Sequence, residues 1–212
     1  MKVEDKKYKL TFTSGTLMVN ETCAVATAFI DSGCDWAVTR ERTFRDNLLE
    51  KDKETTKKKV FSLVKQRIST LSKDELSLLI DGAMTVKRQM ALLGVCKVHA
   101  LIFDFISVNV RNSFFDLQEK ITYANFNEFL NEKKYEHTNL DNIADTTASK
   151  IRQAVFRILE QSELIESSNS GLLHRPYLSE DVERSIVMDD PKWLAIFLYS
   201  NNEINNACKL YE

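Results

Sequence analysis

Residues 145–161 read DTTASKIRQAVFRILEQ, and this stretch decides the fold that the sequence predicts. We expect a helix over residues 146–161, because at 100° per residue its apolar and polar side chains separate onto opposite sides. The apolar side carries Ala148, Ile151, Ala154, Val155, Ile158 and Leu159. The polar side carries Thr146, Ser149, Lys150, Gln153 and Arg157. A helix in a DNA major groove needs this division, with one face as anchor and the other meeting phosphates and base edges.

The opening of this helix is repeated earlier in the chain, where residues 54–60 read ETTKKKV. A second amphipathic helix is expected over residues 55–70. Its polar side carries Thr55, Lys58, Lys59, Ser62, Lys65 and Gln66. A lysine-bearing polar face is usually a plain solvated surface, and that interpretation stays open for either helix alone. Two helices with the same opening favour nucleic-acid binding.

Residues 164–173 follow the helix that ends near residue 161, as two short apolar runs around the turn-like sequence SSNSG. This pattern is a hairpin signal. Another helix is expected over residues 123–134, so the order helix, helix, hairpin is that of a winged helix-turn-helix. On the wing, His174 and Arg175 are expected to contact the minor groove or the DNA backbone. A plain hairpin end is the alternative for this pair.

The N-terminal half also reads mainly as helices. Residues 8–13 alternate like a short strand, and helices are expected over residues 16–32 and 35–46, the latter capped by its first residue, an aspartate. The helix over residues 55–70 is therefore the third of a triplet, which is the place of a recognition helix. The sequence SKDE, beginning at Ser72, has the form of a capping box and starts another helix.

Glycine and proline are scarce, with 5 and 2 residues among 212. Tight turns between strands need these residues, so their scarcity favours helices. The sequence therefore predicts a mainly α protein, a helical bundle with a helix-turn-helix-like N-terminal part and a C-terminal winged-helix-like part with a short β-hairpin. We expect two domains, residues 1–115 and residues 116–212, and acidic terminal helices in the second.

The charge of the chain is unevenly distributed. Its net charge of −2 gives no overall attraction to a polyanion. Residues 1–70 hold 14 Lys and Arg against 10 Asp and Glu, whereas residues 71–212 hold 15 against 21. A nucleic-acid surface must therefore be a local patch, and we expect modest, salt-sensitive affinity.

The sequence contains no familiar catalytic or metal-binding motif. It lacks G-x-x-x-x-G-K-[ST], G-x-G-x-x-G, G-x-S-x-G and H-E-x-x-H. Its four cysteines form no C-x-x-C pair and it has only three histidines, so no metal site is expected. We therefore expect no enzymatic activity, no cofactor and no small-molecule substrate. Asp104 is expected to be a buried helix carboxylate paired with Arg67, which falls on the apolar side of its helix.

Residues 90–110 are about as long and apolar as a membrane span, but they contain Lys97, His99, Asp104 and Asn109. A Lys or Asp at mid-bilayer costs about 3 kcal/mol on insertion scales. A central helix of a soluble bundle carries such residues easily. The charged N-terminus has no apolar stretch behind it. We therefore expect a soluble, cytoplasmic protein with no signal peptide and no membrane contact.

Four pieces of the sequence are informative through their order and spacing. They are Tyr8…Phe12-Thr13-Ser14-Gly15-x-Leu17 with Glu21, the 55–71 helix ending Arg67-Ile68-x-x-Leu71, Phe103-Asp104-Phe105, and the 150–159 helix followed by Leu164-Ile165. Together they resemble the BrxA family of BREX (bacteriophage exclusion) phage-defence systems. The resemblance implies an all-helical protein with helix-turn-helix-like parts, akin to the antitermination factor NusB, that binds double-stranded DNA. It also implies a non-enzymatic component working beside a methyltransferase, an ATPase and other BREX proteins.

The expected function is therefore that of a double-stranded DNA-binding component of BREX defence. The residues expected to contact DNA are Thr55, Lys58, Lys59, Ser62, Lys65, Thr146, Ser149, Lys150, Gln153, Arg157, His174 and Arg175. An alternative is a protein-interaction adaptor that contacts DNA only within the defence complex, which the acidic C-terminal section favours. RNA binding, by analogy with NusB, is a third interpretation.

Overall fold

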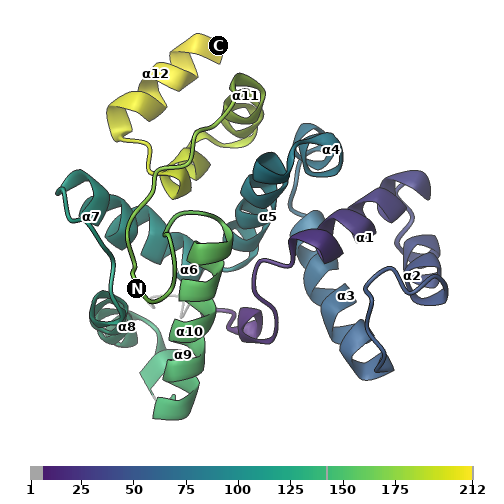
Figure 1. Ribbon diagram of the computed structural model, residues 1–212, viewed down its shortest axis with the longest axis horizontal. Coiled ribbons are helices and arrows are strands. Elements are labelled where there is room, and N and C mark those ends of the chain that lie inside the picture. Colours follow the sequence, from purple (N-terminus) through teal and green to yellow (C-terminus); the bar gives the residue numbers. More distant parts are fainter. Residues whose placement is uncertain (1–6, 142, 212) are drawn as a thin grey trace, which may run out of the picture.

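The computed structural model of the protein describes residues 7–141 and 143–211 (Figure 1). Helices follow one another along most of this length, so the prediction of a mainly α protein is confirmed. Two of them, η1 and η3, are 3-10 helices, and η2 is a π-helix. In chain order the helices are η1 (Thr11–Ser14), α1 (Val19–Asp31), α2 (Trp36–Arg45), α3 (Glu54–Ile68), α4 (Lys73–Asp81), α5 (Met84–Val98), α6 (Ala100–Asp104), η2 (Phe105–Val110), α7 (Arg111–Phe115), α8 (Tyr123–Glu136), α9 (Thr138–Asp141), α10 (Asp145–Gln161), α11 (Glu180–Asp189), η3 (Pro191–Phe197) and α12 (Asn201–Tyr211).

The predicted β-hairpin and the winged-helix wing are wrong, because the described residues contain no β-strand. Two isolated antiparallel bridges form among them, joining Leu173 to Ile165 and Leu172 to Lys120. The segment around Leu172 divides its backbone hydrogen bonds between these two short neighbours. Neither pairing therefore extends into a ladder. The region after α10 is an irregular connection, and the fold class is a helical bundle without a wing.

The segment at residues 8–13 also differs from the expected strand. Its second half, from Thr11, forms most of η1, at whose end Gly15 N donates to Phe12 O at 3.0 Å. The backbone of Tyr8 is bonded by a side chain, since Asn139 accepts from Tyr8 N at 3.3 Å and donates to Tyr8 O at 2.9 Å. With a side chain as its partner in place of a second strand, the alternating sequence forms no sheet.

The N-terminal helices begin where their caps predict. Asp35 Oδ1 accepts from Ala37 N at 2.7 Å and from Val38 N at 3.2 Å, which starts α2. Ser72 and Glu75 form the expected capping box at the start of α4. α1 packs against both α2 and α3, and these three helices form the predicted triplet with α3 as its third member (Figure 1). α1 also packs against α4.

The central helix α5 is buried continuously over residues 89–96. Gly94 allows α3 to pass close by, since a Cβ at this position would lie 3.3 Å from the Cβ of Arg67. The helix ends at His99, whose φ of −118° and ψ of 87° leave the helical region. In the described ranges no single helix is long and apolar enough to cross a membrane, although α5 and residues 100–115, bent by 113°, pass that test as a pair.

Buried apolar side chains form one cluster with members on both sides of residue 115, and the division into two domains there stays a prediction. α11, η3 and α12 pack on one another at the C-terminus. They are tied to the centre of the molecule by Lys97 of α5. Its Nζ lies 2.7 Å from a carboxylate oxygen of Glu75 and 2.8 Å from one of Asp189, so one buried cation joins α4, α5 and α11.

Candidate nucleic-acid interface

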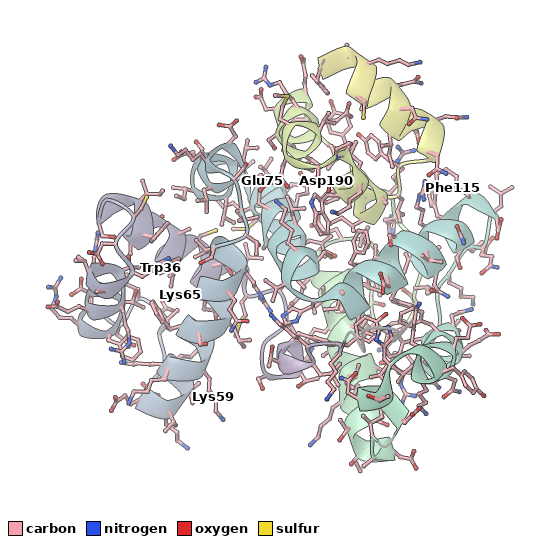
Figure 2. The ribbon with its side chains drawn as sticks, turned by 180° about the vertical axis from the view of Figure 1, so that it is seen from behind. Trp36, Lys59, Lys65, Glu75, Phe115 and Asp190 are labelled. Atoms are coloured by element: carbon pink, nitrogen blue, oxygen red, sulfur yellow. The ribbon has the colours of Figure 1, made fainter. Side chains whose placement is uncertain are left out.

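α3 separates its side chains as its sequence predicts. Val60, Val64 and Ile68 are buried in the core. Lys65 is half-buried, with its ammonium 4.9 Å from the centre of the Trp36 ring (Figure 2). The remaining predicted contact residues of this helix are exposed: Thr55, Lys58, Lys59 and Ser62.

A groove of about 390 Å³ separates the polar face of α3 from η1. Thr11 and Ser14 line it from η1. From α3 it is lined by Lys58, Lys59, Ser62, Leu63 and Gln66. Hydroxyl, amide and cationic groups therefore face this groove from two elements, and these are the groups that bond to phosphates and sugars in protein–DNA interfaces.

The lysines of α3 differ in how strongly they are held. Lys58 Nζ lies 2.7 Å from Glu54 Oε1, and the hydrogen bond between them keeps the pKa of Glu54 below its usual value. Lys59 forms no ion pair within the part of the chain that the structure describes. An exposed pair such as Lys58–Glu54 contributes at most about 1 kcal/mol. Lys59 is therefore the most available cation of this helix.

α10 repeats the arrangement. Ile151, Val155 and Ile158 are fully buried, which confirms the predicted apolar side. Lys150 and Arg157 form no ion pair among the described residues. The polar side is exposed at Thr146, Lys150, Gln153 and Arg157 and half-buried at Ser149.

The two helices are joined through the backbone of one residue, Leu17, in the connection between η1 and α1. Arg67 on α3 donates from Nη1 to Leu17 O and from Nη2 to Gly15 O, both at 3.0 Å. Gln161 at the end of α10 accepts from Leu17 N at 2.9 Å. η1 itself packs on α10 and borders the groove of α3. The segment of η1 therefore fixes the two polar faces relative to each other.

Arg67 does not have the carboxylate partner that we expected. Two of its nitrogens donate to backbone carbonyls instead, and Asp104 accepts from Tyr8 Oη at 2.5 Å. Burial lowers the pKa of Arg67 to about 10, so the guanidinium is still charged at neutral pH. The sequence could not reveal these partners, because every residue has a backbone carbonyl and nothing in the pattern marks those of Gly15 and Leu17 as acceptors.

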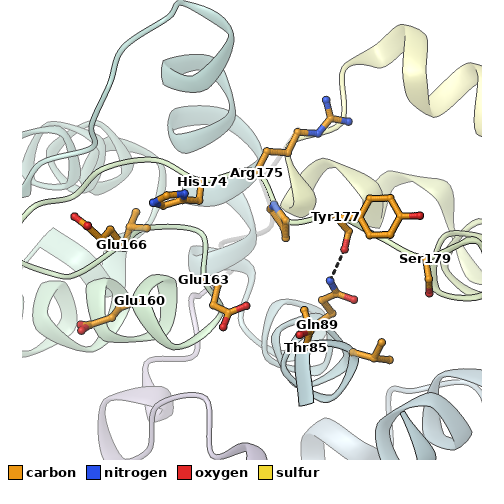
Figure 3. A pocket seen from close by; sticks show the side chains of 12 residues that line it. Thr85, Gln89, Glu160, Glu163, Glu166, His174, Arg175, Tyr177 and Ser179 are labelled. Atoms are coloured by element: carbon orange, nitrogen blue, oxygen red, sulfur yellow. Dashed lines mark hydrogen bonds between the residues drawn. The ribbon is translucent and has the colours of Figure 1, made fainter. Parts of the chain in front are cut away.

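His174 and Arg175 lie on a different groove, between the start of α5 and the segment that leads to α11 (Figure 3). Arg175 Nη2 is 2.8 Å from Glu203 Oε1, and its Cζ lies 4.7 Å from the centre of the Tyr199 ring. Arg175 is therefore engaged by C-terminal residues. These two residues line neither side of the groove between α3 and η1.

One cation near this surface was missed by the sequence reasoning. Arg40 on α2 is exposed, and its charge helps to lower the pKa of Glu54 at the start of α3. The signal in the sequence was the presence of three arginines in α2, Arg40, Arg42 and Arg45. The last two are ion-paired with nearby aspartates, which leaves Arg40 as the cation of α2 beside α3.

Thiols and metal-ligating groups do not contribute to this surface. All four cysteines are free, and burial raises the pKa of the Cys96 thiol well above its usual value. Within the described ranges no group of three His, Cys, Asp or Glu residues is placed to hold a metal ion. The groove between α3 and η1 is lined by hydroxyl, amide, ammonium and aliphatic groups.

These observations define a class of helical proteins in which two amphipathic helices pack their apolar sides into one core and expose cationic side chains on their polar sides. A family model matches residues 6–189, and the chain belongs to that family, BrxA. A relative from Bacillus cereus (strain H3081.97), named BREX protein BrxA, is 24% identical and aligns over 87% of this chain and 92% of its own length. The BREX protein BrxA of Escherichia coli O9:H4 (strain HS) is 21% identical over 84% of each chain. A crystal structure of an uncharacterized protein from Magnetospirillum magneticum shares the fold, with a TM-score of 0.79 and 21% identity over 91% of this chain and 98% of that one.

Proposed function

We propose that this protein is a non-enzymatic, double-stranded DNA-binding component of a BREX anti-phage defence system. The defence role is supported by relatives named BREX protein BrxA that align over most of the chain. DNA binding is supported above all by one observation, that both helices with the repeated opening are bonded to the same residue, Leu17. A coupling of this kind would hold two polar faces in fixed register for one duplex.

Affinity would come mainly from phosphate contacts. Lys59, Lys150 and Arg157 are exposed and form no ion pair among the described residues, so they supply the first contacts. Each phosphate contact adds about 0.9 to the slope of log K against log salt. Because the net charge is −2, distant parts of the chain repel the duplex and the affinity stays modest.

The test is a salt titration of binding to a short fluorescent duplex, read by anisotropy. We expect the double variant Lys59→Glu/Lys150→Glu to weaken binding strongly and to lower the salt slope by about 0.9 for each lysine. Lys120→Glu/Lys209→Glu is the matched control, with the same change of net charge at two other exposed lysines. An equal loss in both variants would show attraction to the whole chain and would contradict the proposed surface.

A second candidate function is an adaptor that docks onto another BREX protein, such as the methyltransferase or the ATPase, and contacts DNA only in that assembly. It is favoured by the carboxylates at the end of α10 and on α11, which line two grooves on the C-terminal part of the chain. Co-purification with a tagged methyltransferase or ATPase from nuclease-treated lysate, together with no binding of the duplex by the isolated chain, would select the adaptor.

A further inference from the structure

Residues 174–178 run between two grooves that lie apart from α3 and η1. The first, of about 570 Å³, is bordered by the start of α5 and the end of α10 (Figure 3). The second, of about 520 Å³, is bordered by α11 and the last residue of α12. Tyr177 lines both grooves and is 84% exposed. An exposed tyrosine between two grooves is the kind of residue that carries binding energy in protein interfaces.

The acidic residues that line the two grooves are five glutamates: Glu160, Glu163, Glu166, Glu180 and Glu183. One of them, Glu163, is ion-paired with Arg88. The other four form no ion pair within the described part of the chain. The guanidinium that lines the grooves, that of Arg175, is already paired with Glu203. The surface therefore carries an excess of negative charge and of hydrogen-bond acceptors.

A second, independent feature of the first groove is a buried acceptor. Gln89 is only 3% exposed, and its Nε2 donates to Tyr177 O at 2.8 Å. Its Oε1 has no hydrogen-bond partner among the described residues. A buried amide oxygen without a donor is unfavourable, and a donor that enters the groove would relieve this. The same hydrogen bond restrains the backbone at Tyr177, and this limits the positions that its exposed ring can take.

The chain itself places a guanidinium in this environment. Arg175 Cζ lies 4.7 Å from the centre of the Tyr199 ring, and Arg175 is also ion-paired with a carboxylate. Tyr199 Oη in turn donates to Glu183 at 2.5 Å. A tyrosine ring flanked by carboxylates therefore already binds an arginine here. Tyr177, with its neighbouring glutamates, offers the same combination with its ring still exposed.

We propose that the two grooves around Tyr177 bind an arginine-containing basic segment of a partner protein. A guanidinium stacks on an aromatic ring and presents five N–H donors in one plane, which suits the ring of Tyr177, the glutamates and Gln89 Oε1 together. The same carboxylates repel nucleic acid. None of the predicted DNA contacts on α3 and α10 lines these grooves, although Glu160 lies on the same exposed side of α10 as Arg157, so the peptide site is tested with substitutions separate from those that test DNA binding.

The experiment titrates the full chain into a fluorescein-labelled peptide of arginines spaced by glycines, at low salt. The test variant is Tyr177→Ala/Glu166→Gln/Glu180→Gln. The control is Tyr135→Ala/Glu128→Gln/Glu132→Gln on α8, which removes an exposed tyrosine and two exposed glutamates and so changes the charge equally. We expect the test variant to bind about tenfold more weakly than the wild type and the control to stay within about twofold. A lysine peptide of the same spacing should bind about threefold more weakly than the arginine peptide.

Any of four outcomes would overturn the proposal. These are no binding of the arginine peptide, an equal loss in the test and control variants, equal affinity for the lysine peptide, and self-association of the wild type that Tyr177→Ala abolishes. The last would identify a second copy of this chain as the occupant. The Lys59→Glu/Lys150→Glu protein should bind the peptide at least as well as the wild type, which separates this result from that on DNA.

Discussion

α3 and α10 open with the same pair of threonines, but their cations have different neighbours. On α3 one lysine is ion-paired with Glu54, and Lys65 lies over the ring of Trp36. On α10, Lys150 and Arg157 form no ion pair in the described part of the chain. The two contacts on α3 have different origins, because Glu54 lies one turn before Lys58 on the same helix, whereas the ring of Trp36 is brought to the polar side of α3 by α2. The sequence therefore indicates which side chains share a face and which lysine has a carboxylate one turn away, whereas a neighbouring helix decides that Lys65 lies over a ring.

The largest effect is expected from breaking the connection between the two helices. Arg67→Met removes the donors of Gly15 O and Leu17 O, two hydrogen bonds from a charged group. At about 2 kcal/mol each, their loss should lower the free energy of unfolding by about 4 kcal/mol, measured by urea denaturation. The affinity for the duplex should also fall, because the segment that holds α3 and α10 in register loses its bonds to α3.

Arg67→Lys is the informative companion to this variant. A lysine can reach one carbonyl but lacks the fork that bonds to two, so we expect it to recover only part of the stability. If Arg67→Met unfolds at the same urea concentration as the wild type, the two helices are not held through Leu17, and the comparison between them loses its structural basis.

The next effect concerns η1, which lies between the two helices, and it depends on pH. The ring of Phe12 in η1 packs edge-on against His99 at 5.2 Å between centroids, and His99 Nδ1 is 3.2 Å from Lys9 O. Burial, and secondarily the charge of Arg67, lowers the pKa of His99 from 6.5 to about 4. Between these two values the unfolded chain binds a proton that the folded chain does not. Stability therefore falls as pH falls through this window, by about 3 kcal/mol in total, and is not affected by His99 above it.

His99→Gln removes this titration while leaving an amide that can still donate to Lys9 O. Its unfolding free energy should change less than that of the wild type between neutral pH and about pH 4, as followed by urea denaturation. His174→Gln is the matched control, because His174 is exposed and its replacement should leave the wild-type pH dependence. Identical profiles for His99→Gln and the wild type would show that His99 is not the group responsible.

Local patterns predicted those parts of the fold and the site that depend on residues close in sequence. Helical periodicity identified the exposed and buried sides of α3 and α10, and the cap at Asp35 followed from neighbouring residues alone. The hairpin was wrong because the segment around Leu172 also bonds to residues 119–121, a neighbour that no local pattern indicates. The predicted partner of Arg67 was wrong for the same reason, since the carbonyls that it bonds to lie in a loop that is distant in sequence. His174 and Arg175 were assigned to a wing that does not form, so their grouping with the two helices had no structural basis.

The smallest effects come from removing single cations, and they test the comparison directly. Lys150→Gln and Arg157→Gln should each lower the salt slope of duplex binding by about 0.9. Lys58→Gln should lower it by less, because Lys58 is engaged by Glu54 and releases fewer counterions when the duplex binds. Glu54→Gln frees Lys58 and should raise both the affinity and the slope, after which Lys58→Gln in that background should match Lys150→Gln. Equal slopes for Lys58→Gln and Lys150→Gln in the wild-type background would mean that DNA displaces Glu54 at no cost, and the two helices would then be equivalent in binding despite their different neighbours.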